Sequence, residues 1–383
     1  MIPASAATGA DTGSRIGDHA RIIAVALGSR AVLLLIGALT LASQSEDRRM
    51  HVDHLLSLFV RWDAAWYLGI ATEGYTTDFP ADHPGATRYA YFPLYPLLIR
   101  GAAMATGLAA APASVLLSTL LFVLALCLVH EYALAIGMRR DVGLASAVLL
   151  AFAPQSFVFS SAYSESTFLA LLVGAMLALR QERYVVAGVL AALLSAVRPN
   201  GVVFVAFAAA WIWQRFGWRA LLMPWRAPGP HLALVMAPLG LVGYWWFAFA
   251  TTGDAFAQAT SIAHGWGWRG NWPWFNLARH IGAPTIDRFW AWGSIGYFVA
   301  SLWLLRYRLF AEFALCATGF LLNWISVLPN SLVRYALVYF PIFIALSRAT
   351  AGHAPSQAAL AATLALVNGM LMVAFTLQWI VSI

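Results

Sequence analysis

Long apolar runs recur along this chain and constrain its fold more than any other feature. One run extends from Arg21 to Ser43, and another extends from Ala113 to Ala135. A helix of about 20 apolar residues is long enough to cross the hydrocarbon core of a bilayer. Charged residues make up only 10% of the chain, whereas a soluble domain contains about 25%. The sequence therefore predicts an all-α polytopic membrane protein, a bundle of about ten or eleven transmembrane helices that forms one domain over residues 1–383.

The charges follow a pattern typical of membrane proteins. All 23 basic residues are arginines, the formal net charge is +7, and the arginines are scattered at the ends of apolar runs. This distribution indicates the positive-inside rule and not a nucleic-acid-binding stripe, so no nucleic-acid partner is expected. It predicts a cytoplasmic tail at residues 1–19, with no cleavable signal peptide, and outer loops at residues 44–88 and 251–288. The two cysteines lie inside apolar runs and are expected to be packed thiols.

The path of the chain is ambiguous at residues 89–108. This stretch is long enough to span a membrane, but two prolines and an arginine interrupt it. If it spans fully, the following Arg139-Arg140 pair lies outside. If it only dips into the outer leaflet, that pair lies inside, and the charge bias favours this second path.

Two further stretches bear on where the polar residues lie. A helix is expected from Gly143 to Phe159, and it leads to the polar sequence Ser160-Ser161-Ala162-Tyr163-Ser164-Glu165-Ser166 on the outer side. The expected helices Tyr184–Ala196 and Val202–Trp213 are each too short to span alone. The intervening Arg198-Pro199-Asn200-Gly201 is therefore expected at a break within the outer half of the membrane.

The first outer loop contains a carboxylate between two tryptophans, in the sequence Arg61-Trp62-Asp63-Ala64-Ala65-Trp66. If residues 62–71 are helical, Asp63 lies in the first turn, next to unpaired backbone N–H groups and the positive helix end, which favours an ionised carboxylate. One interpretation is the cap of a helix at the membrane interface, where tryptophan and tyrosine concentrate. The other interpretation is a functional acid.

The remaining polar residues at membrane depth map to the same outer half of the chain. They are Tyr91, Glu165, Arg198, Asp254, His264 and Arg334. Charges at membrane depth are costly and generally functional, so together with Asp63 they predict one outward-facing cavity. Simpler alternatives remain for single members: a structural Glu165–Arg198 ion pair, an Arg198 side chain that snorkels to the interface, and a surface position for His264.

Patterns for cofactor binding are not evident in the sequence. There is no Walker motif, glycine-rich dinucleotide turn, nucleophile elbow, His-Glu-x-x-His or Asp-x-Asp sequence. The order His51-Val52-Asp53-His54 is only weakly suggestive of a metal site, so a divalent metal is possible but not signalled. The two halves of the chain also lack the matching broken helices of many secondary transporters.

Five motifs, in this order, resemble the PIG-V-like mannosyltransferases. They are Arg61-Trp62-Asp63-Ala64, Tyr91-Phe92-Pro93-Leu94-Tyr95-Pro96, Ala162-Tyr163-Ser164-Glu165-Ser166, Arg198-Pro199-Asn200-Gly201, and Arg334-Tyr335 with Phe340-Pro341. The resemblance implies a GT-C-like membrane glycosyltransferase with a catalytic acid in the first outer loop and a polyprenyl-phosphate sugar donor. It implies transfer of a sugar, with mannose expected, to a lipid-linked or glycan acceptor. The expected location is the inner membrane of a bacterium, which would not make glycosylphosphatidylinositol, so that acceptor does not carry over.

The resemblance and the chemistry together assign roles to these residues. Asp63 is the expected general base, because a carboxylate can take the proton of an attacking hydroxyl. Arg198 and Arg334 are expected at the donor phosphate, because guanidinium binds phosphate oxygens in bidentate fashion. The other expected substrate-binding residues are Arg61, Trp62, Tyr91, Tyr95, Tyr163, Glu165, Asn200 and Tyr335. The alternatives are a transporter or flippase for a lipid-linked sugar and a non-enzymatic subunit of a transferase complex.

Overall fold

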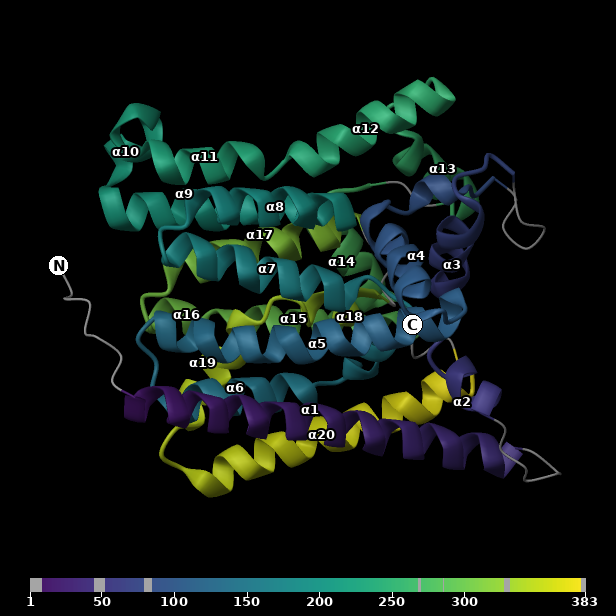
Figure 1. Cartoon of the computed structure of the whole chain (residues 1–383), viewed down its shortest axis with the longest axis horizontal. Coiled ribbons are helices and arrows are strands. Elements are labelled where there is room, and N and C mark those ends of the chain that lie inside the picture. The colour runs from purple at the N-terminus through teal and green to yellow at the C-terminus, as the bar shows by residue number, and fades with distance from the viewer. Residues whose placement is uncertain are drawn as a thin grey trace.

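The computed structural model describes residues 9–44, 52–78, 85–267, 270–284, 286–326 and 331–379. In these ranges the chain forms helices and turns and no strand (Figure 1). Most of the helices lie side by side with their axes in a similar direction, and shorter helices gather at one end of this bundle. The predicted all-α fold is confirmed.

Within the described ranges, four helical stretches are long and apolar enough to cross a membrane: Arg15–Gln44, Ala110–Ala135, Pro228–Thr252 and Ala354–Thr376. The first belongs to α1 (Gly9–Gln44), the second is α5, and the last is α20. The third consists of α11 (Pro228–Met236) and α12 (Leu239–Thr252), which follow each other directly. From Gly9 onward, the residues of the predicted polar tail form the first turns of α1.

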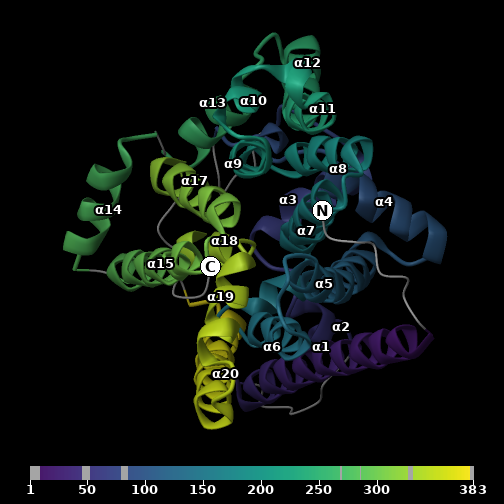
Figure 2. The same ribbon diagram turned by 90° about the vertical axis from the view of Figure 1, so that its left-hand side faces the viewer.

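The centre of the bundle is made of shorter helices, of which the first packs against α5. They are α7 (Glu165–Arg180), α8 (Tyr184–Val197), α9 (Val203–Phe216) and α17 (Phe310–Ser326). Contacts join α5 to α7, α7 to α8, and α9 to α17, and Figure 2 shows them end-on as a packed group. As predicted, α8 and α9 are short and are joined at a break, the 3-10 helix η3 (Pro199–Val202), with Arg198 immediately before it.

The helix predicted for Gly143–Phe159 is much shorter in the structure. It is α6 (Arg140–Ala151), and a buried irregular segment with the 3-10 helix η2 (Ser156–Ser160) follows it. Pro154 explains the early end, because proline cannot continue the helical hydrogen bonds and disfavours helical geometry in the residue before it. The irregular segment that leads to Glu165 contacts the first outer loop, where the N–H of Ala162 donates to the carbonyl of Phe59 at 2.8 Å.

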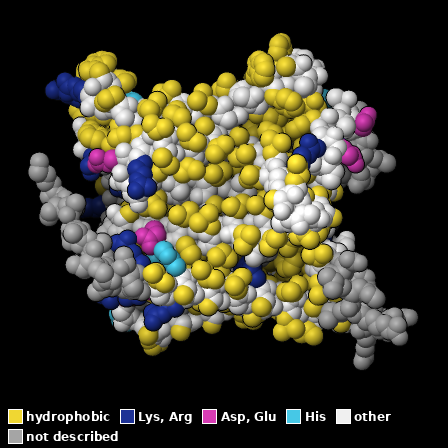
Figure 3. Space-filling model, in the orientation of Figure 1, with side chains coloured by type: hydrophobic (Ala, Val, Ile, Leu, Met, Phe, Trp, Pro, Cys, Tyr) yellow, Lys and Arg dark blue, Asp and Glu magenta, His cyan; other side chains and the backbone are white. Residues whose placement is uncertain are grey.

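The two ends of the bundle differ in charge. We call one the basic end, because arginines at the ends of its helices outnumber the carboxylates there; they include Arg139, Arg140, Arg180, Arg183, Arg215 and Arg219. Ion pairs at this end join Arg140 to Asp18 and Arg180 to Glu312. Figure 3 shows hydrophobic side chains over the middle of one face and charged side chains toward both ends. The Arg140–Asp18 pair resolves the ambiguity at residues 89–108: α5 begins at the opposite end and returns to the start of α1, so residues 89–108 do not span the bundle. The path favoured by the charge bias is the one observed.

The opposite end, which we call the site end, is covered by short helices from the two predicted outer loops. The first loop contributes α2 (Val52–Ser57), α3 (Asp63–Glu73) and the 3-10 helix η1 (Arg88–Ala90), followed by α4 (Leu94–Thr106). The second loop contributes α13 (Ala257–Gly265) and α14 (Pro273–Gly282). Ser261 of α13 accepts a hydrogen bond from the backbone N–H of Thr87 at 2.7 Å, so the two loops are joined.

The remaining helices complete the bundle. They are α10 (Trp218–Leu222), η4 (Pro224–Arg226), α15 (Asp287–Ser301), α16 (Trp303–Arg306), α18 (Leu332–Ala336) and α19 (Pro341–Thr350). Of these, α18 carries Arg334 and packs against α15 and α17. It thereby brings the last predicted motif to the site end.

Candidate active site

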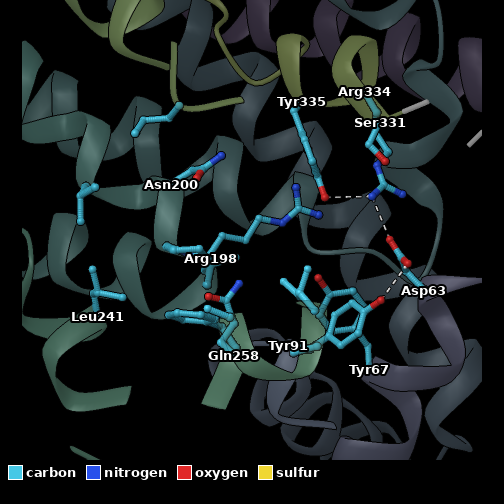
Figure 4. A pocket seen from close by; sticks show the side chains of 18 of the residues that line it. Asp63, Tyr67, Tyr91, Arg198, Asn200, Leu241, Gln258, Ser331, Arg334 and Tyr335 are labelled. Carbon is cyan, nitrogen blue, oxygen red and sulfur yellow. Dashed lines mark hydrogen bonds and ion pairs between the residues drawn. The ribbon is translucent and has the colours of Figure 1, made fainter. Parts of the chain in front are cut away.

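A cavity of about 480 Å³ opens at the site end of the bundle (Figure 4). Its polar lining comes from Asp63, Tyr67, Tyr91, Arg198, Asn200, Gln258, Ser331, Arg334 and Tyr335. Its apolar lining includes Val197, Val202, Leu241, Ile262 and Leu322. The lining therefore combines α3, the segment before α4, the α8–α9 break, α13 and α18, which are far apart in the sequence.

Asp63 is the first residue of α3, but it does not cap that helix. The cap position is occupied by Trp62, and no side-chain hydrogen bond caps the helix. Instead, Oδ1 of Asp63 accepts a hydrogen bond from the Tyr91 hydroxyl at 2.9 Å, and Oδ2 accepts one from Nη2 of Arg334 at 2.8 Å. The interpretation of Asp63 as a helix cap is therefore wrong, and its carboxylate faces the cavity with both oxygens engaged.

Tyr91 lies between η1 and α4, outside the membrane-spanning helices. Burial, together with the nearby Asp63 carboxylate, holds the pKa of its hydroxyl well above the ordinary value. The hydroxyl therefore remains protonated at neutral pH and can donate its hydrogen bond to Asp63. Its ring stacks on Trp66 of α3 at a centroid distance of 5.7 Å, which fixes the orientation of the phenol.

Glu165 joins the two arginines of the site. Its side chain is fully buried, and its Oε1 lies 2.8 Å from Nη2 of Arg198 and 3.1 Å from Nε of Arg334. Glu165 is the first residue of α7, where the positive helix end favours a carboxylate. The predicted Glu165–Arg198 pair is present, and the structure adds Arg334 to it. With Asp63, the cluster contains two carboxylates and two guanidinium groups.

The two arginines differ in their hydrogen-bond partners and in the exposed fraction of their side chains. Nη2 of Arg334 bonds to Asp63 and to the Tyr335 hydroxyl, and only 2% of this side chain is exposed. Arg198 donates from Nε to Ser164 at 2.7 Å and from Nη2 to Glu165. Among the described residues, none accepts a hydrogen bond from its Nη1, and 13% of this side chain is exposed. Nε and Nη1 of Arg334 also lack hydrogen-bond partners among the described residues, but both atoms are buried. Arg198 is thus the guanidinium that a ligand in the cavity can reach more easily.

Amide side chains provide a second kind of polar group. Asn200 donates from Nδ2 to Asn323 at 2.7 Å, which holds its amide at the cavity wall. Gln258 projects from α13, and Figure 4 shows its amide directed toward the interior of the cavity near Arg198. Within the described part of the chain, Gln258 forms no side-chain hydrogen bond. Its donor and acceptor are therefore available to a ligand.

Several predicted substrate-binding residues lie behind the cavity wall. Arg61, Trp62, Tyr95, Tyr163 and Glu165 do not belong to its lining. The Tyr163 hydroxyl donates to the backbone carbonyl of Arg61 at 3.0 Å, and the Tyr95 hydroxyl bonds to Ser118 at 2.8 Å. These contacts place Tyr163 and Tyr95 behind the residues that line the cavity, where they support them.

Two residues expected in the cavity lie elsewhere. Asp254 lies before the start of α13, where it accepts hydrogen bonds from the Phe256 backbone and the Thr260 hydroxyl. His264 is exposed on the same helix. The side chains of the weak metal-like sequence at residues 51–54 lie outside the described part of the chain. Among the residues that are described, no group of three or more His, Cys, Asp or Glu side chains could hold a metal.

Sequence reasoning missed four residues near the site. Tyr67, Gln258 and Ser331 line the cavity, and Ser164 bonds to both Tyr67 and Arg198 from behind it. Tyr67 lies four residues after Asp63, at helical spacing on the same face, and this spacing was a usable signal. Gln258 carries no such signal, because its position depends on how α13 docks against the first loop.

The fold and the site together define a helical membrane protein with an ionic cavity at one end of its bundle. The family model described as Mannosyltransferase (PIG-V) matches residues 27–274, and the chain belongs to that family. It is 31% identical over 185 residues to GPI alpha-1,6-mannosyltransferase 2 of Mus musculus, which covers 46% of this chain and 36% of the mouse protein. For the protein of that name from Cricetulus griseus the identity is 33% over 166 residues, covering 41% and 32%. The chain thus spans about a third of the length of the curated relatives it matches.

Among solved structures, the chain resembles an oligosaccharyltransferase of Archaeoglobus fulgidus in complex with Zn and sulfate. The identity is 11%, the TM-score is 0.49, and the match covers 91% of this chain and 53% of the other. That score is too low for the likeness to carry an argument about this chain.

Proposed function

We propose that this protein is a GT-C type hexosyltransferase. It transfers a sugar, with mannose as the first candidate, from a polyprenyl-phosphate donor to a lipid-linked or glycan acceptor. The observation that carries the proposal is the presence of a carboxylate, Asp63, and a guanidinium with a free donor, Arg198, on the wall of one cavity. Membership of the mannosyltransferase family supports the same assignment.

The proposed reaction uses Asp63 as the general base. The acceptor oxygen forms a bond to the anomeric carbon while the bond from that carbon to the phosphate oxygen breaks. The electron pair of the broken bond leaves on the lipid phosphate, and the hydroxyl proton passes to Asp63. The carboxylate becomes neutral as the phosphate gains a negative charge, so negative charge moves toward the guanidinium groups and does not accumulate.

The contacts favour different roles for the two arginines, which the sequence assigned to the phosphate together. Arg198 has an uncommitted donor and is the better candidate for the phosphate. Arg334 is held by Asp63, Glu165 and Tyr335, and its proposed role is to orient the base. The apolar lining residues Leu241, Ile262 and Leu322 suit an isoprenoid chain.

The proposed sugar contacts come from the remaining polar and aromatic lining. Asn200 and Gln258 offer amide donors and acceptors for hydroxyl groups, and Tyr91, Tyr335 and Trp266 offer ring faces and edges. No cofactor is required by this scheme, because guanidinium groups supply the positive charge at the leaving group. Transfer should therefore persist in a metal chelator, and loss of transfer that added magnesium restores would contradict this part of the proposal.

We propose that the cavity lies on the outer side of the inner membrane of a bacterium. The arginines at the basic end support this orientation, because cytoplasmic ends carry an excess of positive charge. Cysteine labelling in spheroplasts tests it, with Cys127 and Cys316 replaced. A cysteine at Thr76, in the first loop, should react with an impermeant maleimide from outside, and one at Gln181, beside Arg180, should not. The opposite result inverts the topology.

The activity itself is tested with purified protein, radiolabelled polyprenyl-phosphate mannose and a crude lipid extract. Label in a new glycolipid supports the transferase. Accumulation of the intact donor across a vesicle membrane, without new product, supports the flippase instead. An assembly subunit would give neither result. The family match does not favour the flippase.

A further inference from the structure

The backbone immediately before Asp63 adopts a conformation that residues with a side chain rarely adopt. Trp62 has φ 43° and ψ −109°, in the region where φ is positive. A bulky residue is found there only where its surroundings enforce the conformation, and such positions concentrate at functional sites. The conformation matters for Asp63, because relaxing Trp62 to helical geometry would rotate the chain by about 100° around its N–Cα bond.

The indole ring of Trp62 is held by the C-terminal helix. Its centroid lies 4.8 Å from that of Phe375 on α20, with an interplanar angle of 61°. The side chain of Phe375 is 1% exposed, and its ring also lies 4.6 Å from Phe157 in η2. One ring thus contacts both the residue before Asp63 and the segment that leads to Glu165.

A polar contact fixes α20 against the same segment. Nδ2 of Asn368 donates to Oγ of Ser156 at 2.8 Å, and both residues are buried. Ser156 in turn receives a hydrogen bond from the buried guanidinium of Arg30 on α1. This hydrogen bond anchors α20 to η2, so Phe375 is held next to Trp62. All of α20 lies beyond the residues that match the family model.

A backbone connection completes the support. The N–H of Ala162 donates to the carbonyl of Phe59 at 2.8 Å, and the Tyr163 hydroxyl donates to the carbonyl of Arg61. These bonds hold the chain on the N-terminal side of Trp62, and Phe375 holds its side chain. Asp63, the next residue, is then directed toward Tyr91 and Arg334.

We propose that Phe375 is a positioning residue for Asp63. Its ring keeps Trp62 in the conformation with positive φ, and this conformation directs the Asp63 carboxylate into the cavity. The inference rests on the proposed function of Asp63 as the base, but the placement of the carboxylate can be measured without it.

The test uses the full chain in lipid nanodiscs and the variant Phe375→Ala. Displacement of a catalytic group by about 1 Å can cost about 100-fold in rate, so we expect kcat to fall at least about tenfold while the KM values for donor and acceptor stay within about twofold. The matched control is Phe343→Ala on α19. Phe343 is equally buried, and its ring contacts Tyr297, away from Trp62. The control should lose a similar amount of thermal stability and keep its kcat.

A second measurement does not depend on turnover. The amides of Ala64 and Ala65 donate to the carbonyls of Arg61 and Trp62, and hydrogen exchange at these amides reports on the turn. Exchange should speed up in Phe375→Ala and not in Phe343→Ala. In an Asp63→Asn background, Phe375→Ala should reduce the residual rate further by less than about twofold, because the two residues act through one carboxylate.

The outcomes separate this inference from the proposed function. Unchanged exchange at Ala64 and Ala65 in Phe375→Ala overturns the inference whatever the activity. An equal fall of kcat in Phe343→Ala also overturns it, because the effect would then be general. If the wild-type chain transfers no sugar while exchange rises only in Phe375→Ala, the positioning stands and the proposed function fails. If Phe375→Ala does not fold, the same kinetic and hydrogen-exchange measurements are made on Phe375→Leu, which keeps an apolar side chain but lacks the ring.

Discussion

Nη2 of Arg334 lies 2.8 Å from Oδ2 of Asp63, although 271 residues separate the two in the sequence. The pair joins the first predicted motif to the last one across the cavity. It also means that the proposed base is oriented before any substrate arrives. A carboxylate that already points at the reaction site loses little entropy on reaching the transition state. The predictions below follow from this arrangement.

The first prediction concerns Asp63→Asn. Asparagine retains the shape of the side chain and can accept a hydrogen bond, but it cannot take a proton at neutral pH. We expect turnover to fall by at least about 100-fold, the low end of general-base contributions. Donor affinity, measured with a non-reacting polyprenyl phosphate, should stay within about fivefold because Arg198 is unchanged. Asp63→Glu should retain partial turnover. A folded Asn variant with normal turnover would remove Asp63 from the role of base.

The second prediction separates the two arginines. Lysine keeps the charge but loses the planar fork. Because Arg198 is the more exposed of the two arginines in the cavity, Arg198→Lys should weaken binding of polyprenyl phosphate by about 10-fold to 100-fold, the range for a charged hydrogen bond. Arg334→Lys should mainly lower kcat, because it disturbs the contacts to Asp63 and Tyr335. Calorimetry and steady-state kinetics measure the two quantities, and the reverse pattern would exchange the assigned roles.

The third prediction concerns the stability of the cluster. Glu165→Gln removes a buried negative charge that lies between the buried guanidinium of Arg334 and the largely buried one of Arg198. Breaking a buried ion pair costs about 3–5 kcal/mol. The control is Glu182→Gln, which removes an ion pair to Arg215 whose two side chains are about half exposed, and which should cost less than about 1 kcal/mol. Unfolding in mixed micelles of increasing SDS content measures both. Equal losses of unfolding free energy in the two variants would show that the buried ion pairs of Glu165 stabilise the protein no more than the exposed Glu182–Arg215 pair.

The fourth prediction concerns Gln258→Ala on α13. Loss of one or two neutral hydrogen bonds should raise the KM for a sugar-bearing substrate about 2-fold to 10-fold. Affinity for polyprenyl phosphate without a sugar should not change. Thr260→Ala on the same helix is the matched control, since Thr260 bonds to Asp254 and not to the cavity. If both variants behave like wild type, Gln258 does not contact the sugar.

The sequence was sufficient for features that depend on local pattern. The apolar runs predicted the spanning helices, and the short helices on either side of Arg198 predicted the break at η3. The sequence also contains the signal for the early end of α6, although the predicted helix ran past it, because Pro154 lies within the stretch expected to be helical. The charge bias predicted the correct path for residues 89–108. Each of these signals lies within one or two turns of the chain.

Other features depend on how distant elements dock and left no local signal. The pairing of Glu165 with Arg198 was among the alternatives, but the second bond to Arg334 requires α18 to lie beside the start of α7. The place of Gln258 on the cavity wall depends on the fit of α13 against the first loop. The positive φ of Trp62 could not be anticipated either, since a tryptophan is among the least expected residues there.

The shared oxygen of Glu165 has a consequence for how this protein can vary. The two carboxylates and two guanidinium groups balance each other, so the cluster carries no formal net charge. Replacing one member with a neutral residue leaves an uncompensated charge, which is costly in a buried place. Relatives that lack Glu165 should therefore also lack one of the arginines, and loss of Arg334 should accompany a change at Asp63 or Glu165. Across the family, a change at one of these four positions should be accompanied by a change at a position of opposite charge.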